Sequence, residues 1–296
     1  MNPNPILPRT GWPVVAVAAV ALVLASLPVS GAPVPLPRTH AHNDYEHTRP
    51  LFDALDQGFC SVEADVYLVN GELLVAHNRG DVKPERTLQA LYLNPLRDRV
   101  RANAGHVYPE LGSNKTLRRP LATTAPDVEF TLLIDIKTEG ADVYRRLQSL
   151  LPEYKEMLTH FTPDSTTPGA ITVILSGDRP RPMVAAEKER WCALDGLLTD
   201  LDANTSVHLV PLISESWRPT FHWFTNGVLE KPDQALLRST VERTHAQGRR
   251  LRFWGIQDQS YVWRELQAAG VDLINTDKLA ALAGMLNAPA APGAHP

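Results

Sequence analysis

Short apolar runs rich in β-branched residues alternate with helix-like segments between about residues 36 and 286, and this alternation restricts the possible folds more than any other feature. Such a pattern is typical of βα units built around a parallel sheet. Strands are expected at Ser61–Leu68, Phe130–Ile136, Ile171–Leu175, Gly196–Thr199, Leu209–Ile213, Arg250–Trp254 and Leu273–Asn275, with an eighth ending near Thr39. Helices are expected at Leu51–Gln57, Ala141–Leu158, Arg181–Trp191, Asp233–Gln247, Gln259–Ala269 and Lys278–Leu286. Eight strands at this length favour a closed (β/α)₈ TIM barrel, and without a glycine-rich phosphate loop an open nucleotide-binding sheet has no support.

The expected barrel has one irregularity, directly after its second strand. Asn70-Gly71 lies between two apolar runs, which predicts a tight hairpin with Leu73–His77 as the returning strand. No internal repeat or linker divides the body, although Ala102–Pro126 is a long, irregular insert. Residues 33–286 are therefore expected to form one domain.

Both ends of the chain differ from this body. A nearly uncharged start, an apolar run over Trp12–Leu27 and the small residues Ser30-Gly31-Ala32 follow the order of a secretory signal peptide at residues 1–32. We expect an exported protein with no stable membrane span after cleavage; an uncleaved N-terminal anchor is the alternative. Residues 287–296 are mostly Ala and Pro and predict a disordered tail.

The net charge of the chain restricts the classes of binding partner that can be expected. The 29 Lys and Arg residues against 33 Asp and Glu give a net charge of −4. The chain therefore lacks the excess of basic residues that would indicate a nucleic-acid partner. A monomer acting on a small molecule or a lipid is expected.

Cys60 and Cys192 could form a disulfide in an exported chain, but the apolar surroundings of Cys60 also fit a buried free thiol.

Polar residues gather where the first three barrel strands are expected to end. His40, His42 and Asn43 follow the first strand, and His77 ends the returning arm of the hairpin. The second strand carries Glu63 and Asp65, and the third ends in Asp135-Ile136-Lys137. Residues two apart on a strand share a face, and TIM-barrel sites lie at the carboxyl ends of the strands. We therefore expect these side chains to converge.

Three carboxylates that share one barrel mouth indicate a bound cation. Oxygen ligands favour Mg²⁺, or alternatively Ca²⁺, over Zn²⁺, which prefers His and Cys. Two imidazoles, one near residue 40 and one at His77, could then move protons, and Lys137 adds a positive charge. This combination suits cleavage of a phosphodiester.

These residues resemble one known family. The chain is similar to the altered-inheritance-of-mitochondria-six family, within the phospholipase-C-like phosphodiesterase superfamily that includes glycerophosphodiesterases and venom-type phospholipase D. The resemblance is carried by His40, His42–Tyr45, Pro50-Leu51, Gly58, Ser61–Val66, Leu73–His77, Arg86–Leu88, Leu91–Leu93, Leu133–Thr138, Ser176–Pro180, Leu251–Trp254 and Gly270–Asp277. The Pro-Glu-Asn-Thr run of glycerophosphodiesterases, whose acid helps to build their metal site, is replaced here by Glu46–Pro50.

The resemblance implies a phosphoric diester hydrolase, or a lyase that releases a cyclic phosphate, with Glu63, Asp65 and Asp135 as Mg²⁺ ligands. It implies two catalytic histidines, of which His77 is one. The His-x-x-Asn spacing of venom-type relatives selects His40 as the other. If the run His42-Asn43-Asp44 is taken as the motif instead, it selects His42. Lys137 joins the catalytic set, and His42, Asn43, Trp254 and Asn275 are expected to bind substrate. Trp254 also fits a barrel-core aromatic residue, and Asn275 a helix cap.

Two other functions compete with this interpretation. A His-x-His at the first strand also begins metal-dependent amidohydrolases, but these need histidines at the middle strands, where this sequence has Thr199-Asp200 and Ile213-Ser214. The second is a non-catalytic exported binding module on the same barrel.

Overall fold

The computed structural model describes residue 1 and residues 33–109, 129–222, 224–225 and 227–288. All of these except Met1 belong to one compact unit, Ala32–Pro296. The expected signal peptide, most of the expected tail and much of the insert at 102–126 lie outside the described residues. No helix in the described part of the chain combines the length and hydropathy that a membrane crossing requires.

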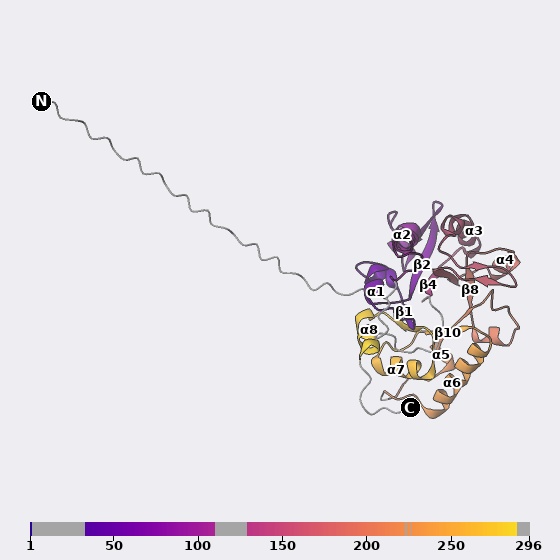
Figure 1. Ribbon diagram of the computed structural model, residues 1–296. Coiled ribbons are helices and arrows are strands. Elements are labelled where there is room, and N and C mark those ends of the chain that lie inside the picture. The colour runs from indigo at the N-terminus through magenta and orange to yellow at the C-terminus, as the bar shows by residue number, and fades with distance from the viewer. Residues whose placement is uncertain (2–32, 110–128, 223, 226, 289–296) are drawn as a thin grey trace. The chain divides into compact units, whose positions relative to one another are not determined.

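Eight parallel strands surround a common axis, in the order β1, β2, β4, β7, β8, β9, β10, β11 (Figure 1). They are β1 (Thr39–Ala41), β2 (Ser61–Val69), β4 (Phe130–Ile136), β7 (Ile171–Gly177), β8 (Ala193–Gly196), β9 (Leu212–Ser216), β10 (Arg250–Trp254) and β11 (Ile274–Thr276). An isolated bridge between Arg252 and Leu273 links β10 to β11, so the ring is nearly closed. The TIM-barrel prediction is confirmed.

Helices follow the strands around the ring. They are α1 (Phe52–Asp56), α2 (Asn94–Ala102), α3 (Gly140–Leu150), α4 (Arg181–Ala186), α5 (Trp217–Thr220), α6 (Lys231–Ala246), α7 (Ser260–Ala269) and α8 (Leu279–Asn287). Short 3-10 turns include Asp44–Glu46 and Leu198–Leu201, and a π-helical stretch, Gln89–Leu93, precedes α2. The hairpin is present: β3 (Glu72–Val75) pairs antiparallel with β2, although it ends two residues before His77, the expected end of the returning strand. A small ribbon of β5 (His160–Phe161) and β6 (Thr166–Thr167) was not expected.

Several expected boundaries were wrong. The strand predicted at Gly196–Thr199 is β8, which ends at Gly196 because the Asp200 carboxylate accepts from the Leu197 N–H at 2.9 Å and turns the chain into a 3-10 helix. The strand predicted at Leu209–Ile213 begins three residues later, as β9. The helix predicted to reach Leu158 ends at Leu150, just before Pro152. The helix predicted over Arg181–Trp191 ends at Ala186.

Apolar packing falls into two clusters. The larger cluster includes Val62, Ala64 and Val66 of β2 and the buried faces of the helices. The smaller one includes Leu133, Ile174, Ala193, Leu212 and Leu273. Because strand residues alternate, Leu133 and Ile174 share the side of Asp135 and Ser176, which is the barrel interior. Cys60 and Cys192 are buried free thiols, so the disulfide alternative was wrong.

Candidate active site

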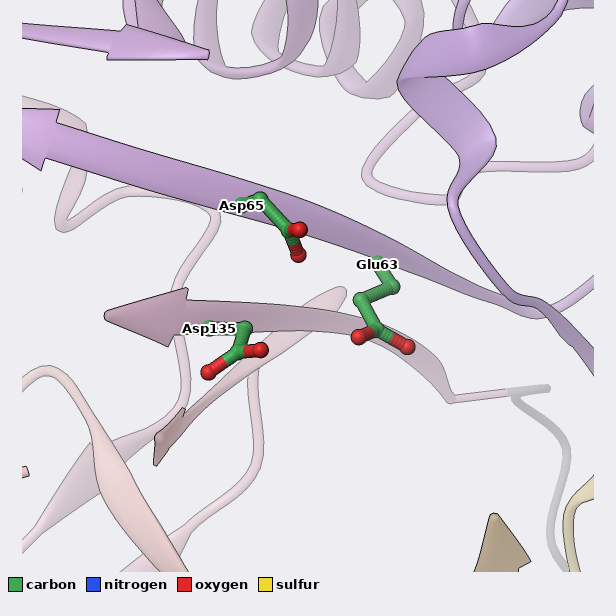
Figure 2. Close-up of side chains that lie close together, drawn as sticks. All are labelled: Glu63, Asp65 and Asp135. Atoms are coloured by element: carbon green, nitrogen blue, oxygen red, sulfur yellow. The ribbon is translucent and has the colours of Figure 1, made fainter. Parts of the chain in front are cut away.

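Three carboxylates converge from two neighbouring strands: Glu63 and Asp65 from the first half of β2, and Asp135 from the end of β4 (Figure 2). Glu63 and Asp65 lie on one face of β2, and Asp135 is the register partner of Asp65 on β4. One oxygen from each residue lies within 4.8 Å of the others. The expected convergence is confirmed: sequence spacing on β2 and the β2–β4 register together create the cluster.

Lys137 sits against the two aspartates. Its Nζ lies 2.6 Å from Asp65 Oδ2 and 2.7 Å from Asp135 Oδ2. Asp65 is fully buried, and burial raises its pKa to about 6 although hydrogen bonds from Lys137 and Tyr45 oppose the shift. Within the described residues, Asp65 Oδ1 is buried and has no hydrogen-bond partner. A buried acceptor without a partner is costly, and a cation is the group that would satisfy it. The carboxylate oxygens therefore fit a hard divalent cation.

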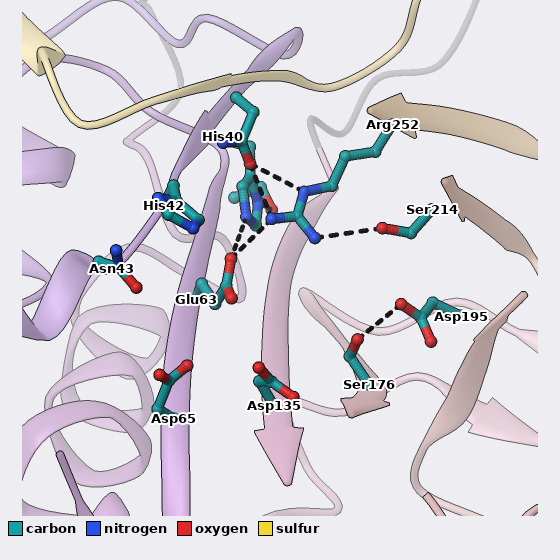
Figure 3. Close-up of polar contacts among 12 residues, drawn as sticks. His40, His42, Asn43, Glu63, Asp65, Asp135, Ser176, Asp195, Ser214 and Arg252 are labelled. Carbon is teal, nitrogen blue, oxygen red and sulfur yellow. Dashed lines mark hydrogen bonds and ion pairs between the residues drawn. The ribbon is translucent and has the colours of Figure 1, made fainter. Parts of the chain in front are cut away.

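Glu63 is held from the other side by His40 and Arg252 (Figure 3). His40 Nε2 lies 3.1 Å and Arg252 Nη2 2.7 Å from Glu63 Oε2. Burial would raise the pKa of Glu63, but the charge of Arg252 and the His40 hydrogen bond hold it well below its usual range. Glu63 is therefore ionised.

The structure places His40 away from the open end. It is fully buried, and its Nδ1 lies 2.7 Å from Ser61 Oγ while Nε2 binds Glu63, so both ring nitrogens are engaged. Burial and the charge of Arg252 lower the pKa of His40 to about 3. A group with this pKa and no free nitrogen is poorly suited to proton transfer near neutral pH.

His42 lies two residues after His40, just beyond the end of β1, and its environment differs from that of His40. Its side chain is partly exposed, and Nδ1 lies 2.7 Å from Asp277 Oδ1, beyond the end of β11. Burial lowers the pKa of His42, but the hydrogen bond to Asp277 and the charge of Glu63 outweigh it, so the net pKa is raised. A carboxylate on one ring nitrogen orients the imidazole and stabilises its protonated form.

His77 approaches the carboxylates from the hairpin arm. Its Nδ1 lies 3.1 Å from the Tyr45 hydroxyl and 3.4 Å from Asp65 Oδ2, and the side chain is 54% exposed. The Tyr45 hydroxyl also lies 2.5 Å from Asp65 Oδ2 and 2.7 Å from Asn43 Oδ1. A hydroxyl that donates to Asp65 can accept from the Nδ1–H of His77, which leaves Nε2 able to take a proton.

Comparison with known proteins supports one family for this chain. A family model described as AIM6-like phosphodiesterase domain matches residues 31–194, more than half of the chain. The chain belongs to this family. A second model, described as the glycerophosphoryl diester phosphodiesterase family, matches residues 250–280. The family resemblance predicted from the sequence is confirmed.

Individual relatives extend over most of this AIM6-like protein. An altered inheritance of mitochondria protein 6 homolog from Arthroderma benhamiae is 29% identical over 268 residues, which cover 85% of this chain and 84% of the relative. Altered inheritance of mitochondria protein 6 from Lachancea thermotolerans is 28% identical over 285 residues, 82% of this chain and 64% of the relative. A glycerophosphodiester phosphodiesterase structure from Agrobacterium tumefaciens aligns with a TM-score of 0.49 at 15% identity, covering 86% of this chain and all of that one.

The residues expected to bind substrate separate in this AIM6-like domain. Trp254 ends β10 and is 46% exposed, so it is not a barrel-core aromatic residue. Asn275 is buried, and its Oδ1 accepts two hydrogen bonds from Arg252, at 3.0 and 2.7 Å. Asn43 Oδ1 lies 2.7 Å from the Tyr45 hydroxyl, beside the carboxylates. Asn275 is thus occupied within the barrel interior, whereas Asn43 borders the site and Trp254 is open to solvent.

Sequence reasoning missed three residues that shape the site: Tyr45, Arg252 and Gly177. Tyr45 connects Asp65 to His77, and Arg252 binds Glu63. Gly177 ends β7 with φ +69°, and a Cβ there would overlap with Asp135 Oδ1. A signal for Arg252 was present: Leu251 and Phe253 alternate with Arg250 and Arg252, so one set must face the interior of a closed barrel.

Another buried carboxylate, Asp195, lies with Ser176 near Asp135, at the ends of β7 and β8 (Figure 3). Ser176, the register partner of Asp135, donates to Asp195 Oδ2 at 2.7 Å, and Arg179 Nε lies 2.9 Å from Asp195 Oδ1. Burial raises the pKa of Asp195 to about 6, although the charge of Arg179 opposes the shift.

Proposed function

We propose that this protein is an exported, divalent-cation-dependent phosphoric diester hydrolase. The observation that carries the proposal is the cluster of Glu63, Asp65 and Asp135, whose oxygens lie within 4.8 Å of one another beside two imidazoles at the carboxyl end of the strands. Export rests on the pattern of residues 1–32.

The three carboxylates would hold Mg²⁺, with Ca²⁺ as the alternative, because both prefer oxygen ligands. A bound Mg²⁺ supplies neutralisation of charge on the nonbridging oxygens of a phosphodiester. Lys137, held between Asp65 and Asp135, adds a fixed positive charge on the same side.

Proton transfer is assigned to His77 and His42. His77 Nε2 is the proton acceptor, because Tyr45 and Asp65 engage Nδ1 and orient the ring. His42 is the proton donor to the leaving oxygen, because Asp277 favours its protonated form. This assignment replaces His40, whose two ring nitrogens are engaged in the barrel interior.

The proton taken by His77 comes from water in the hydrolase outcome. Where the substrate has a hydroxyl next to its phosphate, that hydroxyl can attack instead and release a cyclic phosphate. The exposed indole of Trp254 offers an apolar wall for a lipid or other small-molecule diester. We propose a monomer that needs no nucleic-acid partner.

Turnover of a generic aryl phosphodiester tests this function. The protein is assayed with Mg²⁺, then with EDTA, and then with Mg²⁺ in excess, with an aryl amide as a second substrate. Activity on the diester that EDTA removes and Mg²⁺ restores supports the proposal. Activity on the amide would indicate an amidohydrolase, and cation binding without turnover of any diester would indicate a binding module.

A matched pair of histidine variants assigns the activity to this site. His77→Ala removes the proposed proton acceptor, whereas His208→Ala removes a partly buried histidine bonded to Thr166 outside the site. Only His77→Ala should lose turnover. Equal activity in the two variants would contradict the assignment.

A further inference from the structure

Arg252 is a buried cation in the wall of the barrel. It is 3% exposed on β10 and donates to residues of three other strands: Ser214 Oγ at 3.2 Å, Asn275 Oδ1 at 2.7 Å and Glu63 Oε2 at 2.7 Å (Figure 3). Among these hydrogen-bond partners in the described structure, only Glu63 is charged. A buried guanidinium needs a negative partner, so Glu63 is its counter-ion.

The Glu63 carboxylate therefore has two roles: it is the counter-ion of Arg252, and it belongs to the proposed cation site. Arg252 and His40 both contact Oε2, and every side-chain hydrogen bond of Glu63 to the described residues uses this oxygen. The same side chain belongs to the oxygen cluster proposed to hold a divalent cation. A cation there and the guanidinium share a carboxylate, and like charges so close together in a protein interior repel each other.

The charges of the cluster can be counted. Three carboxylates, one guanidinium and one ammonium leave a single net negative charge. A divalent cation turns this into a single net positive charge, which one phosphodiester monoanion neutralises. Without Arg252 the loaded cluster would be neutral, and an anionic substrate would gain less from entering it.

We propose that Arg252 is a positioning residue that fixes Glu63 and sets the charge of the site, weakening the hold on the cation so that the loaded site attracts a monoanionic diester. The inference rests on the function proposed above and deepens it. Replacing Arg252 by a neutral residue should move two constants in opposite directions: the cation binds more tightly, and the KM for a diester rises.

The test compares Arg252→Met, Arg252→Lys and Arg250→Met with the unaltered protein. Arg250, two residues earlier on β10, contacts Thr131 and Glu129 and serves as the control for loss of one positive charge from the same strand. Calorimetric titration with Mg²⁺ alone should show a Kd at least about tenfold lower for Arg252→Met, given the strength of charge repulsion at short range. Arg252→Lys, which keeps the charge, and Arg250→Met should stay close to the parent value.

Thermal unfolding provides a readout that does not depend on activity. Arg252→Met leaves the buried Glu63 carboxylate with His40 but without its cationic partner, so the cation-free variant should have a lowered Tm, and Mg²⁺ should raise that Tm more than it raises the Tm of the parent. If Arg252→Met does not fold without Mg²⁺, Arg252→Met combined with Glu63→Gln should restore folding by removing the unpaired charge. An equal Mg²⁺-induced shift in the parent and in Arg252→Met, or a weaker cation affinity in the variant, would overturn the proposal.

The two proposals fail in different ways. If the protein turns over a diester but its Mg²⁺ affinity does not change when Arg252 is replaced, the role of Arg252 is rejected and the hydrolase proposal stands. An Arg252-dependent Mg²⁺ affinity without diester turnover supports the role of Arg252 in cation binding and rejects the hydrolase. A parent protein that binds no Mg²⁺ rejects both.

Discussion

Gly177→Ala should separate the cost of backbone strain from the cost of displacing a cation ligand. Gly177 has φ +69°, and a Cβ there would overlap with Asp135 Oδ1 and Ile136 O. An alanine in this region of φ costs about 1–2 kcal/mol by itself. The Asp135 carboxylate must also move, and disturbing the groups that orient a metal ligand typically weakens metal affinity by about 10–100-fold.

Gly71→Ala is the matched control. Gly71 in the β2–β3 turn has φ +83°, and nothing lies within 4 Å of a Cβ built there. Both variants should lose stability in denaturant unfolding, but only Gly177→Ala should lose affinity for Mg²⁺ in a calorimetric titration. The reasoning is refuted if the two variants bind Mg²⁺ equally well, because Asp135 would then not depend on the space that Gly177 leaves.

Three further predictions concern proton transfer and pH. His77→Ala should lower kcat by about 10²–10⁴-fold, the usual contribution of a general acid or base, with Tm unchanged because the side chain is half exposed. Asp277→Asn should lower the pKa of His42 and move the alkaline limb of the pH–rate profile to lower pH; an unmoved limb would exclude His42 as the proton donor. Burial raises the pKa of Asp44 from 3.8 to about 7, so its protonated form stabilises the fold below pH 4, and this contribution is lost as pH rises through 7. Urea unfolding should show that Asp44→Asn removes a pH-dependent term of about 4 kcal/mol at most, and a pH dependence identical to that of the parent would contradict the shift.

Alternation along single strands predicted the carboxylate cluster well. Glu63 and Asp65 had to share a face of β2 because Val62, Ala64 and Val66 occupy the other. The contribution of Asp135 followed from its place at the end of the next barrel strand. These positions depend on local periodicity and on the order of strands, both of which are visible in a sequence.

The different environments of His40 and His42 could not be predicted in this way. They depend on the depth at which β1 sits in the ring, and that depth is set by its register with β11, where His40 is paired with Asn275. One layer separates a histidine buried among Ser61 and Glu63 from one that meets Asp277. Register between strands distant in sequence is tertiary information that spacing motifs do not contain.

Strand boundaries near residues 196–213 failed for a local reason. The Asp200 carboxylate accepts a hydrogen bond from the Leu197 N–H, which competes with strand pairing and ends β8 at Gly196. Apolar residues such as Leu197 and Leu198 then fall in a turn, although their hydrophobicity predicted a strand.

The side chain of Arg252 also bears on how the cylinder stays shut. β10 and β11 share one isolated bridge, Arg252 to Leu273, so this seam has little backbone pairing in the described structure. The guanidinium reaches from β10 to Asn275 on β11, to Ser214 on β9 and across to Glu63 on β2. A cation that binds Glu63 therefore also perturbs the side-chain contact that holds β10 against β11. Amide hydrogen exchange of β10 and β11 should change when the cation binds at β2.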